Sequence, residues 1–228
     1  MLLLLLFGKR SMNLRRINCL MENAKNYVII DSGFISFEKA WGWQIDLVEK
    51  RRREEIPNTL ILCEHEPVYT IGRNFKEKAP DSLPFPVFRI ERGGKITYHG
   101  PGQLVLYPIW KLQPKKILPF IRSIEQSLIN LLALFDLKAE ARKGETGVWV
   151  GRKKIASIGI AVKHWVAFHG AALNINPELS NFFFIQPCGY PPDTMTSLSQ
   201  ELGKKISIAE VKEKILQGKF QIDVESPL

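Results

Sequence analysis

The chain has 228 residues, of which 45% are hydrophobic and 24% are charged, and its formal net charge is +9. This composition excludes a wholly disordered protein and predicts one folded domain with a sizeable core. The cysteines Cys19, Cys63 and Cys188 are odd in number and lack CxxC spacing, so we expect neither a disulfide framework nor a zinc site. No apolar run is long enough to span a bilayer.

Residues 1–26 differ from the rest of the chain. They begin with a run of leucines and carry five basic residues against one acidic residue, which leaves +5 for the other 202 residues. The apolar run precedes the basic one, the reverse of a secretory signal. We interpret residues 1–26 as an N-terminal extension and residues 27–228 as the folded domain. The extension is either a start-site artefact of a cytoplasmic protein or a transit peptide for a mitochondrial or plastid matrix.

Along residues 27–228, β-branched apolar runs alternate with helical spacing. The first helix is predicted from residue 37 to the run at 51–53, the second starts at Pro119 and ends near residue 135, and the last opens with the capping box of Ser207 and Glu210. Gly93-Gly94 is a hairpin signal between two short strands. The predicted strands cover residues 27–31, 58–63, 88–91, 95–98, 103–110, 147–150, 154–162 and 165–175.

Residues 92–103 contain four glycines and one proline in twelve positions. Glycine lets the backbone approach a ligand closely and exposes its N–H groups as donors. Composition alone favours a hairpin with tight turns over a ligand site. His99 by itself is more typical of a structural histidine than of a catalyst.

Cys188 stands between Pro187, which fixes φ, and Gly189, which accepts any φ. The backbone is therefore expected to turn sharply here and to present the thiol. A lone cysteine is more often buried and inert, so the residue needs a partner to be a nucleophile. Lys154, at the start of an apolar strand, is such a partner if the fold brings it close, because a neighbouring ammonium favours the thiolate.

The joint occurrence of several motifs resembles the lipoyl(octanoyl) transferase family of the biotin and lipoate protein ligase superfamily. They are RGGKITYHGPGQ at 92–103, GVW at 147–149, KIASIG at 154–159, HGAALN at 169–174, PCG at 187–189 and TSL at 196–198. The resemblance covers roughly residues 27–214. It implies a mixed α/β (α+β) single domain, with a largely antiparallel sheet flanked by helices.

The resemblance also implies the site and the reaction. Cys188 would carry the acyl group as a thioester, and Lys154 would favour its thiolate and act as acid and base. The acyl chain and its carbonyl would be contacted by Arg92, Gly93, Gly94, Lys95, Ile96, Thr97, Tyr98, His99, Ser157, Ile158, Gly159, Gly170, Ala171 and Ala172.

The implied donor is acyl carrier protein, and the implied acceptors are lysines of the lipoyl domains of 2-oxoacid dehydrogenases and of the glycine cleavage H protein. We expect a monomer with no ATP, metal or other cofactor and no membrane partner. The alternatives are a lipoyl amidotransferase or an ATP-dependent lipoate ligase of the same fold. An RNA-binding domain is the alternative from another class, and the mild charge of residues 27–228 argues against it.

Overall fold

The computed structural model describes residues 27–80 and 82–224. The prediction of an N-terminal extension, and Cys19 with it, lies outside the described residues. Among those residues, no helix combines the length and the apolar character that crossing a membrane requires.

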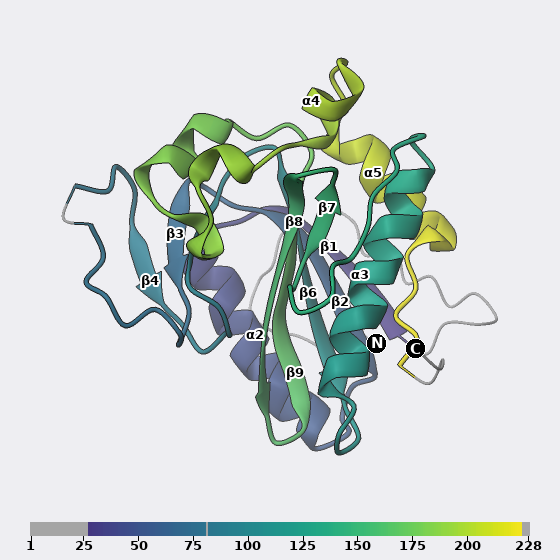
Figure 1. Cartoon of the computed structure of the whole chain (residues 1–228). Helices are drawn as coiled ribbons and strands as arrows, with labels where there is room; N and C mark the ends of the chain where they lie inside the picture. Colours follow the sequence, from purple (N-terminus) through teal and green to yellow (C-terminus); the bar gives the residue numbers. More distant parts are fainter. Residues whose placement is uncertain (1–26, 81, 225–228) are drawn as a thin grey trace.

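A mixed sheet runs through the centre of the molecule (Figure 1). Its first two strands are parallel and every other neighbouring pair is antiparallel. The strand order is β1 (Tyr27–Phe34), β2 (Asn58–Glu64), β6 (Gln103–Lys111), β9 (Val166–Asn174), β8 (Lys153–Lys163) and β7 (Val148–Val150). The predicted meander of β7, β8 and β9 is therefore confirmed.

Helices cover both faces of this sheet. Residues of α2 (Phe37–Arg52) share an apolar cluster with one face, whereas α3 (Ile117–Ala133) and α5 (Ile208–Lys214) share a second cluster with the other. Strand β6 separates the clusters by alternation, because Leu104 and Leu106 face α3 while Val105 and Tyr107 face α2. Both faces are buried, which explains why the run at 103–110 is almost continuously apolar.

A second, smaller sheet has the order β4 (Val87–Arg89), β3 (Val68–Ile71) and β5 (Ile96–His99). Strand β3 lies between the other two and pairs with β4 in parallel and with β5 antiparallel. The predicted hairpin at Gly93-Gly94 is therefore wrong. The segment at 64–73 contains β3, a strand that was not predicted and that lies between β4 and β5. The two glycines therefore belong to a loop that connects β4 to β5 past β3.

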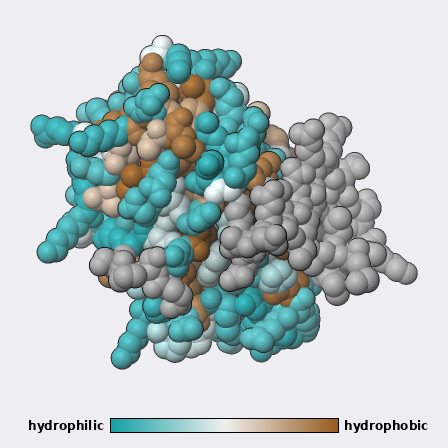
Figure 2. Space-filling model, turned by 90° about the vertical axis from the view of Figure 1, so that its right-hand side faces the viewer, coloured by the Kyte–Doolittle hydropathy of each residue, from teal (hydrophilic) through white to brown (hydrophobic). Residues whose placement is uncertain are grey.

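After β9 the chain runs through short turns of helix, η1 (Leu179–Phe184), η2 (Pro187–Gly189) and η3 (Pro192–Thr194), which pass beside the small sheet (Figure 1). A short helix that the sequence pattern did not indicate, α4 (Leu198–Leu202), precedes α5. The Ser207 capping box at the start of α5 is confirmed. On the side where α3 and α5 lie, the exposed apolar residues are found mainly in the upper part of the view, among hydrophilic side chains (Figure 2).

Candidate active site

Cys188 lies on the sharp turn that its neighbours predict. Its φ is +56° and that of Gly189 is +87°, so two successive residues adopt the left-handed region. The amides of Gly189 and Tyr190 donate to the carbonyls of Gln186 and Pro187 within the turn, each at 3.0 Å. The Cys188 side chain is half-buried, and its Sγ lies 3.9 Å from Oγ of Ser157. The turn therefore presents the sulfur toward β8.

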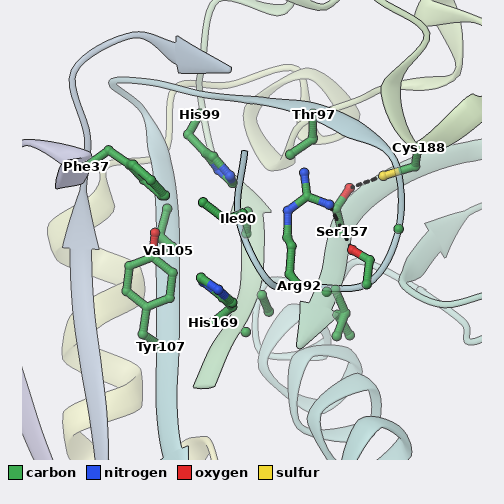
Figure 3. A pocket seen from close by; sticks show the side chains of 17 residues that line it. Phe37, Ile90, Arg92, Thr97, His99, Val105, Tyr107, Ser157, His169 and Cys188 are labelled. Atoms are coloured by element: carbon green, nitrogen blue, oxygen red, sulfur yellow. Dashed lines mark hydrogen bonds between the residues drawn. The ribbon is translucent and has the colours of Figure 1, made fainter. Parts of the chain in front are cut away.

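The sulfur borders a narrow, mainly apolar cavity between β8, β9, the small sheet and the start of α2. Cys188 lies at one end of the group of lining side chains, Phe37 and Tyr107 lie at the other, and Arg92 lies between them (Figure 3). A cavity of this shape suits an unbranched apolar chain whose reactive end is next to the sulfur.

Arg92 is a buried cation in the wall of this cavity. Its guanidinium donates to the carbonyl of Thr70 at 2.6 Å, to Oγ1 of the same residue at 2.9 Å and to the carbonyl of Gly93 at 2.9 Å. None of these acceptors is charged, and Arg92 has no carboxylate partner among residues 27–80 and 82–224. Burial lowers the pKa of Arg92, and the charge of a Cys188 thiolate acts in the opposite direction. A negative charge at the sulfur would therefore have a cation nearby.

A β-bulge in β8 decides where Lys154 points. Val148 pairs with Ala156 but Trp149 pairs with Lys154, so the residue between them has no partner on β7. Consistent with a bulge, Ile155 and Ala156 are adjacent yet belong to the same apolar cluster. The bulge reverses the alternation, and Lys154 and Ser157 share a face of the strand although they are three residues apart. Strict alternation along the sequence puts them on opposite faces.

Lys154 is buried in an aromatic cage. Its Nζ lies 5.2 Å from the ring centroid of Trp149 and 5.0 Å from that of Tyr190, and it donates to the carbonyl of Thr146 at 2.8 Å. Gly147 gives the side chain its room, because a Cβ there would lie 2.6 Å from Cε of Lys154. These contacts stabilise an ammonium. Lys154 and Cys188 are not hydrogen-bonded to each other within the described chain; they are linked through the turn that carries Tyr190.

Three histidines are buried in and behind the far end of the cavity. Burial is the main cause that lowers the pKa of His65 to about 4, of His99 to about 3 and of His169 to about 4. His65 lies 2.8 Å from the hydroxyl of Tyr107, and His169 lies 3.1 Å from a carboxylate oxygen of Glu91. At neutral pH this end of the cavity thus carries neutral imidazoles, which an apolar chain tolerates better than imidazolium ions.

Most of the predicted substrate residues come together around the cavity, but not all of them. Strand β5 alternates, so Thr97 and His99 line the cavity while Ile96 and Tyr98 pack into a separate apolar cluster on the opposite face. Lys95 lies outside, against Gly189. The predicted residues that line the cavity are Arg92, Gly93, Gly94, Thr97, His99, Ser157, Ile158, Gly159, Gly170, Ala171, Ala172 and Cys188.

The cavity also has walls that the motifs did not indicate. Phe37, Ile90, Val105 and Tyr107 line it and come from three separate segments of the chain. His169 also lines the cavity, although the sequence marks it only as the first residue of the HGAALN motif. For Val105 and Tyr107 a signal existed in the alternation of β6. No signal in the sequence marked Phe37, because this first residue of α2 lines the cavity only through the packing of α2 on the sheet.

Comparisons with known proteins show the family of this chain. Residues 36–220 match the lipoyl protein ligase A/B catalytic domain. An octanoyltransferase of Bdellovibrio bacteriovorus is 39% identical over 84% of this chain and 96% of its own length. One of Rubrobacter xylanophilus is 43% identical over 82% of this chain and 88% of its own length.

Solved structures show the same fold at low sequence identity. A putative lipoate protein ligase from T. acidophilum, protein Ta0514, has a TM-score of 0.64 at 16% identity, covering 85% of this chain and 82% of its own. Lipoate-protein ligase A bound with ATP has a TM-score of 0.63 at 15% identity, covering 87% of each chain. The predicted fold class is confirmed. The chain belongs to the lipoyl protein ligase A/B catalytic domain family.

Proposed function

We propose that this acyltransferase moves an octanoyl group from acyl carrier protein to a lysine of a lipoyl domain, through a thioester on Cys188. The observation that carries the proposal is the place of the sulfur, on a strained turn at one end of a narrow apolar cavity with glycine-rich walls. The similarity to octanoyltransferases supports the choice of acyl group.

In the first step the Cys188 thiolate attacks the thioester carbonyl of the donor. The new carbon–sulfur bond forms, the donor's bond breaks, and the carrier's phosphopantetheine leaves as a thiolate. Arg92 is the cation we assign to the negative charge of the tetrahedral intermediate, because the Gly189 and Tyr190 amides are already engaged in the turn. The Lys154 ammonium then gives the leaving thiolate its proton.

In the second step the amine of the acceptor lysine attacks the stored thioester. Neutral Lys154 takes one proton from this amine, an amide forms, and Cys188 leaves as a thiolate. Both groups thereby return to their starting states. The donor thioester already activates the acyl group, so the cycle needs no ATP and no metal or other cofactor.

The partners follow from these two steps. We propose acyl carrier protein as donor and, as acceptors, the lipoyl domains of 2-oxoacid dehydrogenases and the glycine cleavage H protein. One structural neighbour comes from an archaeal lipoylation system, a bipartite lipoate protein ligase and its E2 lipoyl domain from Thermoplasma acidophilum, which supports an acceptor of this class. We further propose that the protein acts as a cytoplasmic monomer.

Intact mass spectrometry after incubation with octanoyl-carrier tests the proposal. We expect one octanoyl increment on the wild-type protein, none on Cys188→Ser, and loss of the increment when lipoyl domain is added. Cys63→Ser is the matched control and should still be acylated, because Cys63 is fully buried and its burial raises its pKa far above the usual range. Acylation of Cys188→Ser, or none of the wild type, contradicts the proposal.

Intact mass spectrometry with other acyl donors separates the alternative functions. An ATP-dependent lipoate ligase would lipoylate the domain from free lipoate and ATP and would keep its activity in Cys188→Ser. A lipoyl amidotransferase would acylate Cys188 from an octanoylated lipoyl domain and ignore octanoyl-carrier. An RNA-binding domain would form no acyl adduct.

A further inference from the structure

A groove outside the acyl cavity adjoins the Cys188 turn from the other side. We propose that this groove receives the phosphopantetheine arm of the donor and that its rim docks the carrier protein. The inference rests on the proposed function and deepens it by assigning the surface that the donor uses.

The groove has a volume of about 470 Å³, and the Cys188 turn itself forms part of its wall. Gln186 and Gly189, which flank Cys188, line the groove, whereas Cys188 lines the acyl cavity. The two spaces therefore meet at the residue that we propose as nucleophile. A thioester whose acyl chain fills the cavity has the rest of its donor on the groove side of the sulfur.

The groove is lined by positive charge. Lys95 lines it and is exposed, and a Cβ on Gly189 would lie 3.0 Å from its Nζ. The side-chain ammonium of Lys95 forms no hydrogen bond or ion pair with any residue that the structure describes. In the neighbouring segment 73–80, Arg73, Lys76 and Lys78 are exposed, against one exposed acidic residue, Glu77. This net positive rim complements the phosphodiester of the arm and an acidic carrier.

The rim also offers aromatic surface to a protein. Phe183 and Phe184 of η1 line the groove with 63% and 49% of their surfaces exposed. Adjacent exposed phenylalanines bordered by basic residues are typical of a docking surface, since an apolar contact needs a partner to exclude water. Because free coenzyme A carries the arm without a protein, the aromatic rim favours the carrier-bound form.

Three octanoyl donors separate the two parts of the proposal. Octanoyl-carrier has both protein and phosphate, octanoyl-coenzyme A has the arm and phosphates without the protein, and octanoyl-N-acetylcysteamine has neither. The readout is the second-order rate constant of Cys188 acylation, measured by mass spectrometry. Thermal unfolding checks that each variant is folded.

Lys95→Gln is expected to lower the rate constants for the carrier and coenzyme A donors about threefold to tenfold relative to octanoyl-N-acetylcysteamine, as one exposed charge contact would. Phe183→Asp is expected to lower the rate constant for the carrier alone, by a similar factor. The matched controls are Lys115→Gln and Leu118→Asp. Both positions are exposed and lie beside or in α3, on the far side of the large sheet from β4, and we expect no change for any donor.

The outcomes distinguish this inference from the proposed function. An equal effect of Lys95→Gln on all three donors, or no effect, refutes the phosphate contact. An unchanged carrier rate in Phe183→Asp refutes the docking rim. In both cases the wild type still becomes acylated, so the proposed function stands. A wild-type protein that reacts with none of the donors refutes the function itself.

Discussion

The buried histidines predict that this protein loses stability in mild acid. An unfolded histidine has a pKa of about 6.5, whereas burial lowers the pKa of His65 to about 4, of His99 to about 3 and of His169 to about 4 in the fold. Below pH 6.5 the unfolded chain therefore binds more protons than the folded one. The stability is complete above pH 6.5 and is lost as the pH falls toward 4.

The size of the loss follows from these values. At pH 5 each buried histidine costs about 2 kcal/mol relative to pH 8, so the three together cost about 6 kcal/mol. Near pH 5 the free energy of unfolding changes by about 4 kcal/mol per pH unit, because three protons are taken up on unfolding. Since domains are stable by only about 5–15 kcal/mol, this loss brings the protein close to unfolding.

Urea denaturation followed by tryptophan fluorescence at pH 8, 7, 6 and 5 measures this dependence. His65→Gln should reduce the slope near pH 5 by about one third, since one proton fewer is taken up. The matched control is His164→Gln, because His164 is the exposed histidine among the four in the chain, and its slope should equal that of the wild type. Equal stability at pH 5 and pH 7 would refute the reasoning, as would a slope that falls equally in both variants.

Two glycines give further predictions. In Gly170→Ala the new Cβ would lie 2.1 Å from the Leu106 carbonyl oxygen in β6, so urea denaturation should show that the free energy of unfolding falls by about 3 kcal/mol or more. The control is Gly42→Ala, in open space within α2, whose free energy of unfolding should rise by about 0.5–1 kcal/mol. Equal stabilities of the two variants would contradict the close approach of β9 to β6. In Gly147→Ala the Cβ displaces the caged lysine, so octanoyl transfer should fall at least tenfold in a mass-based assay, about the factor that corresponds to 1.4 kcal/mol. The control Gly151→Ala also has a positive φ but no neighbour within 4 Å, and it should remain active. Equal activities of the two variants would argue against a role for the cage.

Part of the site was predictable because several of its residues belong to short motifs, each of which is local in the sequence. The Pro187-Cys188-Gly189 turn follows from what proline and glycine allow, and Cys188 does adopt a positive φ. The alternation of side chains along β6 between the two faces of the sheet also depends only on neighbouring residues. These features depend on backbone preferences and on side-chain period, which neighbouring residues decide.

Other features required the tertiary structure. Strand β3 enters between β4 and β5, and no local pattern marks a pairing across such separations. The bulge at Ile155 places Lys154 on the same face as Ser157, which the strict two-residue alternation of a strand denies. The roles of Cys188 and Lys154 remain predictions for the variants above.

The sequence by itself determined a folded α/β domain, a presented thiol and the family that its motifs resemble, because each depends on short stretches of chain. Only the tertiary structure decided that the buried Arg92 and Cys188 line one cavity, that Lys154 lies in a cage of Trp149 and Tyr190, and that a basic groove adjoins the turn. The physical reason is that electrostatic and packing partners are chosen by distance in space, and residues far apart in the chain become neighbours only when the sheet and its helices close.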